Sequence, residues 1–196
     1  MRSPVYWHPF LYHIIMRLLY GKDFNSRYEA LANLIPPNAS VSELCMGDGF
    51  LFHKFLTLKN IKYIGLDFNK TCIKAANRKK IKVQLHNVLV DGIPPADFVI
   101  MQGSLYQFIP NEDVIIQKML DAASVAVIIA EPIRNRADSK NIFVSSLAKY
   151  AVNPGSGHIT KRFNEKTLLE CFRRHKEFRE EQIVDSGKEL VGVFLK

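Results

Sequence analysis

Residues 41 to 50, which read VSELCMGDGF, constrain the fold of this chain more than any other segment. A short apolar run ends at Glu43, and a tight loop of small residues with Gly47 and Gly49 comes after it. The apolar segment after the loop is expected to form a helix. A second apolar run follows it and ends in another acid, Asp67. This order of strand, loop, helix and strand is typical of a unit that binds a nucleoside cofactor, because glycine lets the backbone approach the ligand and the second acid can accept the ribose hydroxyls.

The spacing of the glycines excludes two commoner nucleotide-binding loops. A dinucleotide fingerprint requires G-x-G-x-x-G, and a phosphate-binding P-loop requires G-x-x-x-x-G-K-[ST]. Neither pattern occurs in the sequence. The loop therefore favours a nucleoside cofactor of another kind.

Short apolar runs alternate with helical patterns through most of the chain. Strands are expected near residues 41 to 45, 62 to 66, 82 to 86, 97 to 102 and 124 to 130, and helices near 49 to 58, 70 to 79, 111 to 121 and 139 to 152. Such alternation, with strands rich in Ile and Val, predicts a parallel sheet covered by helices on both faces. The carboxyl ends of those strands meet at one edge, which is where open parallel sheets bind ligands.

The two ends of the chain have other patterns. Apolar residues recur at helical spacing over residues 9 to 20, and a second helix near 25 to 34 is expected to end before the two prolines at positions 36 and 37. Near the C-terminus, Asn164 is a plausible N-cap of a helix. Two strands, 177 to 184 and 189 to 195, are expected to close the chain as an antiparallel hairpin.

The pattern E-x-C-x-G-x-G, which spans residues 43 to 49, resembles the first motif of class I S-adenosylmethionine-dependent methyltransferases. That family usually has three alternating glycines in this loop. Cys45 stands in place of the first glycine, where it is expected to keep an ordinary backbone conformation. Asp67 resembles the acid at the end of the family's second strand. Either Asn87 or Asp91 corresponds to the acid of the third motif.

Later segments resemble the same family in the same order. ADFVIMQGSLYQF resembles the fourth strand and the helix or loop after it, SVAVIIAEPI resembles the fifth strand, and the tail resembles the last helix and closing hairpin. The resemblance covers roughly residues 35 to 196. It implies a Rossmann-like three-layer α/β/α sandwich with a seven-stranded, mostly parallel sheet and an antiparallel last strand. We expect one domain over residues 1 to 196, with residues 1 to 34 as a helical cap on the cofactor-binding core.

The resemblance also implies S-adenosylmethionine as the cofactor and S-adenosylhomocysteine as its product. The residues expected to bind the cofactor are Glu43, Cys45, Gly47, Gly49, Asp67, Phe68, Asn87 and Gln102. In this assignment Asp67 accepts both ribose hydroxyls and Phe68 packs on the adenine. The sulfonium already activates the methyl group, so a general base is needed only where the acceptor loses a proton, and no catalytic residue is assigned.

The acceptor side of the crevice is less well defined by sequence. The candidates are Tyr12, His13, Tyr106, Arg134, Arg136 and His158, each of which has an ordinary alternative in core packing or a solvated surface. The aromatic N-terminal helix is expected to form a lid over an apolar acceptor. Packing against the sheet and a homodimer interface are the alternatives for that helix.

Charge and composition narrow the class of partner. The net charge is +8 and the isoelectric point is near 9.4, which favours anionic partners, although solvated helix faces are the simpler interpretation. The three cysteines are scattered and predict no disulfide framework. The cysteines and the six histidines also lack metal-ligand spacing, so no metal is expected. The apolar first twenty residues are too short and too polar for a membrane span, and a cytoplasmic protein is expected.

These observations favour an S-adenosylmethionine-dependent methyltransferase that acts on a small, apolar or anionic acceptor. Two alternatives stay open. Cys45 and Asn87 depart from the family pattern, which is compatible with an inactive cofactor-binding partner subunit. The positive charge favours an RNA methyltransferase, but the chain reads QGSLYQF where methyltransferases of base amino groups carry an Asn-Pro-Pro-Tyr type motif.

Overall fold

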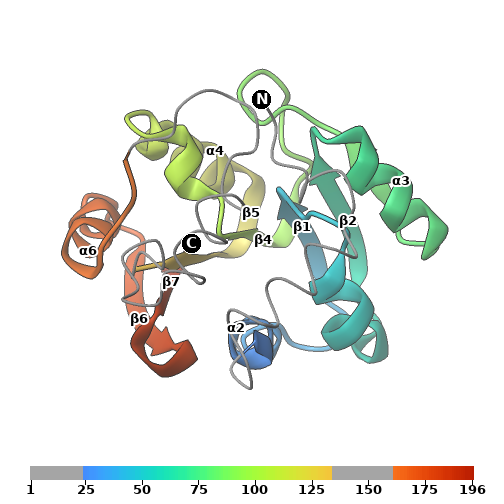
Figure 1. Ribbon diagram of the computed structural model, residues 1–196, viewed down its shortest axis with the longest axis horizontal. Coiled ribbons are helices and arrows are strands. Elements are labelled where there is room, and N and C mark those ends of the chain that lie inside the picture. The colour runs from blue at the N-terminus through green and yellow to red at the C-terminus, as the bar shows by residue number, and fades with distance from the viewer. Residues whose placement is uncertain (1–23, 134–160) are drawn as a thin grey trace, which may run out of the picture.

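A seven-stranded sheet with the order β3-β2-β1-β4-β5-β7-β6 organises the chain in a computed structural model, which describes residues 24–133 and 161–196 (Figure 1). The strands are β1 (Ser40–Leu44), β2 (Lys62–Asp67), β3 (Val83–Leu85), β4 (Ala96–Gln102), β5 (Ala123–Pro132), β6 (Phe178–Val184) and β7 (Glu189–Leu195). The first five strands pair in parallel, and β7 runs antiparallel to both β5 and β6. The predicted fold class, with its antiparallel last strand, is confirmed.

Helices cover both faces of the sheet. They are α2 (Ser26–Asn33), α3 (Lys70–Arg78), α4 (Glu112–Ala122) and α6 (Glu165–Arg173). The first three lie within about two residues of their predicted bounds, and α6 begins directly after its predicted N-cap. Figure 1 shows α4 and α6 on one side of the sheet and α2 on the other. Among these helices none has the length and apolar character that a membrane span requires, a finding that applies to the described residues.

One predicted helix differs from the expectation. The segment near 49 to 58 forms a short π-helix, Phe52–Leu56, and then a 3₁₀ turn, Thr57–Lys59. The hydroxyl of Thr57 donates to the carbonyls of Phe52 and His53, at 2.9 and 3.1 Å. A side chain that bonds the backbone in this way competes with the regular helical ladder, which accounts for the irregular last turns.

The sheet separates two hydrophobic clusters, and β5 shows how one strand feeds both. Val127 and Ile129 are fully buried and pack with residues of α4 and α6. Ala126, Ile128 and Ala130 are buried in the opposite cluster, together with residues of α2. Because successive side chains of a strand point to opposite faces, a strand segment covered on both sides must be apolar throughout, as residues 126 to 130 of this strand are.

The N-terminal part of the described chain belongs to this core. Tyr28, Leu31 and Ala32 of α2 are buried in the cluster on one face of the sheet. The predicted lid helix at residues 9 to 20 and the predicted helix at 139 to 152 lie outside the described residues. The division between a cap of residues 1 to 34 and the core therefore stays a prediction.

Candidate functional site

The loop after β1 turns sharply through three residues in the left-handed region. Cys45, Gly47 and Gly49 have φ angles of 52°, 61° and 73°. The expectation that Cys45 keeps an ordinary conformation is therefore wrong. The alternating turn requires a positive φ at this position whichever residue occupies it, and a residue with a Cβ atom adopts that conformation at a cost of about 1–2 kcal/mol.

The two glycines meet different surroundings. A Cβ atom at Gly49 would lie 2.7 Å from Cδ1 of Ile81, so the end of the Ile81 side chain would have to move, and the φ of 73° favours glycine there as well. A Cβ atom at Gly47 would meet nothing within 4 Å. Gly47 therefore leaves open space beside the loop, with its backbone accessible from that side.

Asp67 joins this loop to the next unit of the fold. The backbone N–H of Gly47 donates to Oδ2 of Asp67 at 2.9 Å, and the N–H of Asn69 donates to Oδ1 at 2.7 Å. Asn69 in turn caps α3 by accepting from the N–H of Thr71 at 3.0 Å. Burial is the main cause that raises the pKa of Asp67 to about 6, against the opposing effect of its two backbone donors.

Glu43 lies beneath the loop and links three strands. The hydroxyl of Tyr63 on β2 donates to Oε2 at 2.6 Å, and the amide of Gln102 on β4 donates to Oε1 at 2.7 Å. Glu43 is buried, and burial raises its pKa to about 7 although both hydrogen bonds oppose the shift. A buried carboxyl with two side-chain donors fixes β1, β2 and β4 relative to one another.

The loop after β3 carries both candidates for the third motif. Asn87 is exposed, and its side chain accepts from the N–H of Leu89 at 3.1 Å. Its own N–H donates to Oδ2 of Asp91 at 2.7 Å. The two residues thus form one turn, which the N–H of His86 ties to the carbonyl of Asp67 at 2.9 Å.

A second group of charged residues lies at the ends of β4 and β5. Glu131 is fully buried, and its Oε1 accepts from the N–H groups of Ser104 and Leu105. Burial raises the pKa of Glu131 to about 8. The guanidinium of Arg162 lies 3.7 Å from the ring centroid of Tyr106, which is buried in the loop after β4.

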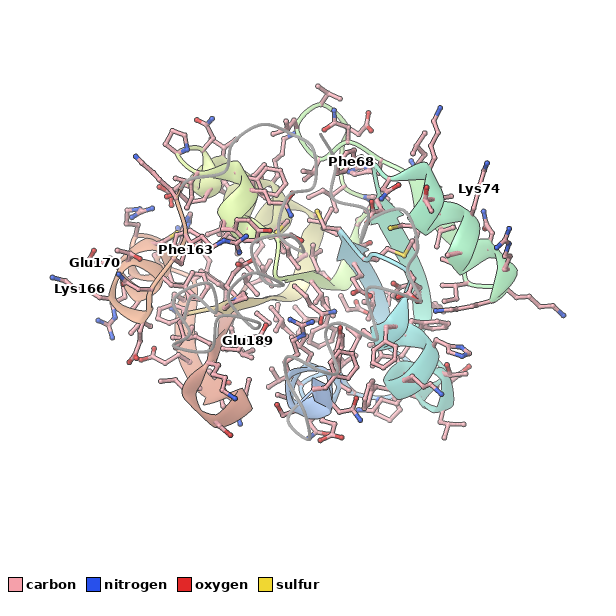
Figure 2. All side chains as sticks on the ribbon, in the orientation of Figure 1. Phe68, Lys74, Phe163, Lys166, Glu170 and Glu189 are labelled. Atoms are coloured by element: carbon pink, nitrogen blue, oxygen red, sulfur yellow. The ribbon has the colours of Figure 1, made fainter. Side chains whose placement is uncertain are left out.

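A buried ion pair lies next to the end of β5, where Glu189 is in register with Pro132. Nη1 of Arg27 in α2 lies 3.0 Å from Oε1 of Glu189. Glu189, which is labelled in Figure 2, is the first residue of β7. Sequence analysis did not single out Arg27, Arg162 or Glu189, because nothing in their local sequence distinguishes them from surface charges. Glu131 did carry a signal, since it ends an apolar strand as Glu43 does.

The structure brings the predicted cofactor residues to one edge. The loop after β1, Asp67 with its neighbour Phe68, Asn87 and Gln102 all lie at the carboxyl ends of β1 to β4. Of the acceptor candidates, Tyr106 lies at this edge. Tyr12, His13, Arg134, Arg136 and His158 lie outside the described residues. Within residues 24–133 and 161–196, no three His, Cys, Asp or Glu side chains gather as a metal site would require.

Several solved structures resemble this one. An O-methyltransferase family 2 protein from Planctomyces limnophilus, in complex with apigenin, has a TM-score of 0.66 at 13% identity over 94% of this chain and 60% of its own. A TehB-like S-adenosylmethionine-dependent methyltransferase from Corynebacterium glutamicum has a TM-score of 0.67 at 14% identity over 98% and 99% of the two chains. Human N-acetylserotonin methyltransferase, in complex with S-adenosylmethionine, has a TM-score of 0.65 at 15% identity over 99% and 58%. No family model and no curated protein matches the sequence.

The chain has the fold of class I methyltransferases. It spans 60% of the length of the Planctomyces protein and 58% of the human enzyme, but nearly all of the Corynebacterium enzyme. Identities of this size establish the fold alone. Activity, cofactor and acceptor have to be argued from the site.

Proposed function

We propose that this chain is a methyltransferase that binds S-adenosylmethionine at the carboxyl edge of its sheet. The observation that carries the proposal is the contact between Gly47 in the loop after β1 and Asp67 at the end of β2. This contact joins a turn of three left-handed residues to a carboxylate on the neighbouring strand. The similarity in fold to methyltransferases, one of them in complex with S-adenosylmethionine, supports the choice of cofactor.

Asp67 has the capacity that ribose binding requires. A carboxylate has about four lone-pair positions, and the N–H groups of Gly47 and Asn69 each occupy one. The remaining positions suit a pair of vicinal hydroxyls. Phe68 is the next residue and is 46% exposed, and in this proposal its ring packs on the adenine (Figure 2).

The loop after β1 would hold the amino acid part of the cofactor. The open space at Gly47 lets a ligand approach the backbone there, where N–H groups and carbonyls can pair with its charged ends. Glu43 and Gln102 support the loop from below through their mutual hydrogen bond. Cys45 acts as a small packing residue in this proposal, because its surroundings raise the pKa of the thiol and keep it protonated.

Methyl transfer requires little of the protein beyond alignment of the acceptor with the methyl group. When bound, S-adenosylmethionine would supply an already activated methyl group, so the residues at this edge would need only to align the acceptor with it and exclude water. We propose a small apolar or anionic acceptor, because Tyr106 and the guanidinium of Arg162 form an aromatic and cationic pair beyond β4. An acceptor of this kind would bind beside the cofactor at the ends of β4 and β5.

One observation favours a second candidate function. Cys45 occupies a left-handed position at which the resembling family has glycine, and this strained substitution lies in the cofactor loop itself. A chain that binds the cofactor only as a structural element, as the inactive partner of another subunit, tolerates such a change more readily than an enzyme does.

Calorimetric titration of the full chain with S-adenosylhomocysteine tests the cofactor site. We expect micromolar binding by the wild type and at least tenfold weaker binding by Asp67→Asn, since charge-assisted hydrogen bonds to the ribose are lost. Asp97→Asn is the matched control. Asp97 also accepts a backbone N–H, from Ser40 at 2.8 Å, but it lies at the amino end of β4 on the opposite edge.

The outcomes separate the two candidate functions. No binding by the wild type, or equal weakening by both variants, would contradict the cofactor site. Binding with the expected loss in Asp67→Asn, but no methyl transfer from labelled S-adenosylmethionine to any of a panel of phenols, carboxylates and quinols, would favour the partner subunit.

A further inference from the structure

One edge of the molecule carries unbalanced positive charge. Residues 68 to 90 contain no Asp or Glu, but they include Lys70, Lys74, Arg78, Lys79, Lys80 and Lys82. Of these six, Lys79 pairs with Asp48. The other five are exposed, and no acidic partner lies within ion-pair distance of them among the described residues.

Helix α3 presents part of this charge on a single face. Lys70, Lys74 and Arg78 succeed each other at intervals of four residues, so they form one stripe along the helix. Ala76 is buried and Ile73 is partly buried against the sheet, which turns the stripe outward. In Figure 2 the side chain of Lys74 points away from the body of the molecule.

Large apolar side chains are exposed beside the start of this helix. Phe68, Leu85, Leu89 and Val90 are 46%, 49%, 59% and 75% exposed. Leu85 is in register with Asp67, the residue before Phe68, and the loop that carries Leu89 and Val90 begins directly after Leu85. The four side chains therefore lie in one region of the molecule. Phe68 lies two residues before Lys70, so cations and apolar side chains are neighbours here. We name these residues the edge surface: Lys70, Lys74, Leu85, Leu89 and Val90. Phe68, at its border, belongs to the proposed adenine contact.

We propose that the edge surface docks on a lipid bilayer with anionic headgroups. Lys70 and Lys74 would lie at the headgroups, and the apolar side chains would enter the boundary with the acyl chains. Arg78, Lys80 and Lys82 add to the attraction over a longer range, within the Debye length of about 8–10 Å. The exposed acid next to this surface, Asp91, is occupied in part by the N–H of Asn87.

The combination of residues distinguishes a bilayer from a nucleic acid. RNA would neutralise the cations, but it offers stacking bases, which suit aromatic rings rather than Leu85, Leu89 and Val90. None of the five residues of the edge surface is aromatic. An anionic bilayer accommodates the cations and the aliphatic side chains together, so it fits more of the side chains that the surface presents.

Co-sedimentation of the full chain with vesicles tests the proposal. We expect binding to vesicles of phosphatidylcholine with about one third phosphatidylglycerol, and little binding to pure phosphatidylcholine. Replacing Lys70 and Lys74 together by Gln should weaken binding about 25-fold, on the basis of about 1 kcal/mol for each cation at the surface. Replacing Leu89 and Val90 together by Ser should weaken it about tenfold.

Matched variants elsewhere serve as controls. Lys161→Gln with Lys166→Gln removes the same charge from exposed positions at and before α6, and Leu58→Ser with Ile183→Ser removes exposed apolar side chains away from the edge surface. Both controls should bind like the wild type. Equal losses in the control variants, no preference for anionic vesicles, or steeply salt-dependent binding to single-stranded RNA without vesicle binding would each overturn the proposal.

Docking is independent of the proposed methyl transfer, and the two tests fail separately. Vesicle binding without S-adenosylhomocysteine binding would contradict the proposed function and leave docking supported. S-adenosylhomocysteine binding without vesicle binding would contradict docking alone.

Discussion

Cys45 is the residue whose conformation departs most from the one that its sequence position suggested. Its φ of 52° places a Cβ atom in the left-handed region, while its side chain packs partly against the core. Glycine would relieve the backbone strain and lose the packing. A glycine variant and an alanine variant both lose the sulfur, but only alanine keeps the Cβ atom. Comparing the two therefore measures the backbone strain.

We expect Cys45→Gly to be more stable than Cys45→Ala by about 1 kcal/mol, because only glycine adopts this φ without strain. Urea unfolding of the two variants measures the difference in the free energy of unfolding. Since both lack the thiol, packing of the sulfur cancels. Equal stability of the two variants would show that the left-handed conformation carries no strain here.

The carboxyl of Asp67 predicts a pH dependence of ligand binding. Its pKa lies at about 6 in the folded chain, above the ordinary value of 3.8. Between these two pH values the folded state holds the proton more tightly than the unfolded state, so this group's contribution to stability falls as the pH rises through the window. Binding runs in the opposite direction, because the deprotonated carboxylate accepts the ribose hydroxyls.

We therefore expect the affinity for S-adenosylhomocysteine to fall as the pH is lowered below about 6, by up to tenfold per pH unit. The measurement is titration calorimetry of the wild type and of Asp67→Asn at several pH values, from below about 6 up to neutral pH. The variant has no carboxyl at this position, so its weaker binding should change much less. Parallel pH profiles would show that another group controls the titration.

Among the elements, α6 illustrates a boundary that local sequence specifies. The side chain of Asn164 accepts from the N–H of Thr167 at 2.9 Å, and Oγ1 of Thr167 accepts from the N–H of Asn164 at 3.0 Å. This reciprocal capping box confirms the N-cap expected from sequence.

Removing this cap should destabilise the protein by about 1 kcal/mol in Asn164→Ala, since the backbone N–H of Thr167 loses its side-chain acceptor. Asn164→Asp keeps an acceptor at the same position and should stay close to the wild type. Thermal unfolding of the three proteins compares them. A loss in Asn164→Asp as large as in Asn164→Ala would contradict the capping role.

At the scale of the whole molecule, the ion pair of Arg27 and Glu189 connects the first described helix to the last strand. Both residues are buried, and they lie 162 positions apart in the sequence. Breaking such a pair leaves a charge without compensation in a medium of low dielectric. The pair therefore couples α2 to the closing hairpin.

We expect Arg27→Met to lower the free energy of unfolding by about 3–5 kcal/mol, and Arg27→Met with Glu189→Leu to recover part of that loss. Lys166→Met is the control, because Lys166 and Glu170 are exposed on α6 and 3.9 Å apart, and its cost should stay below about 1 kcal/mol (Figure 2). A double variant as unstable as the single one would show that the buried charge is not the cause of the instability of Arg27→Met.

Most of the fold could be predicted because its signals are local or periodic. The apolar strands, the cap at Asn164 and the loop between Glu43 and Gly49 depend on neighbours within a few residues. A helix was predicted near residues 49 to 58, but its π and 3₁₀ geometry over Phe52–Leu56 and Thr57–Lys59 was not, since the hydroxyl of Thr57 competes with the regular ladder. The candidate cofactor site could be assembled from sequence for the same reason as the strands, because parallel strands bring their carboxyl ends to one edge.

The amino-acid sequence by itself determined the order of the strands and helices, and the loop and acid that define the candidate cofactor site. Only the tertiary structure decided which distant side chains meet: Arg27 with Glu189, and Arg162 with Tyr106. Backbone patterns repeat over short distances and can be read along the chain. Contacts between residues far apart depend on how the layers pack, and no local pattern records them.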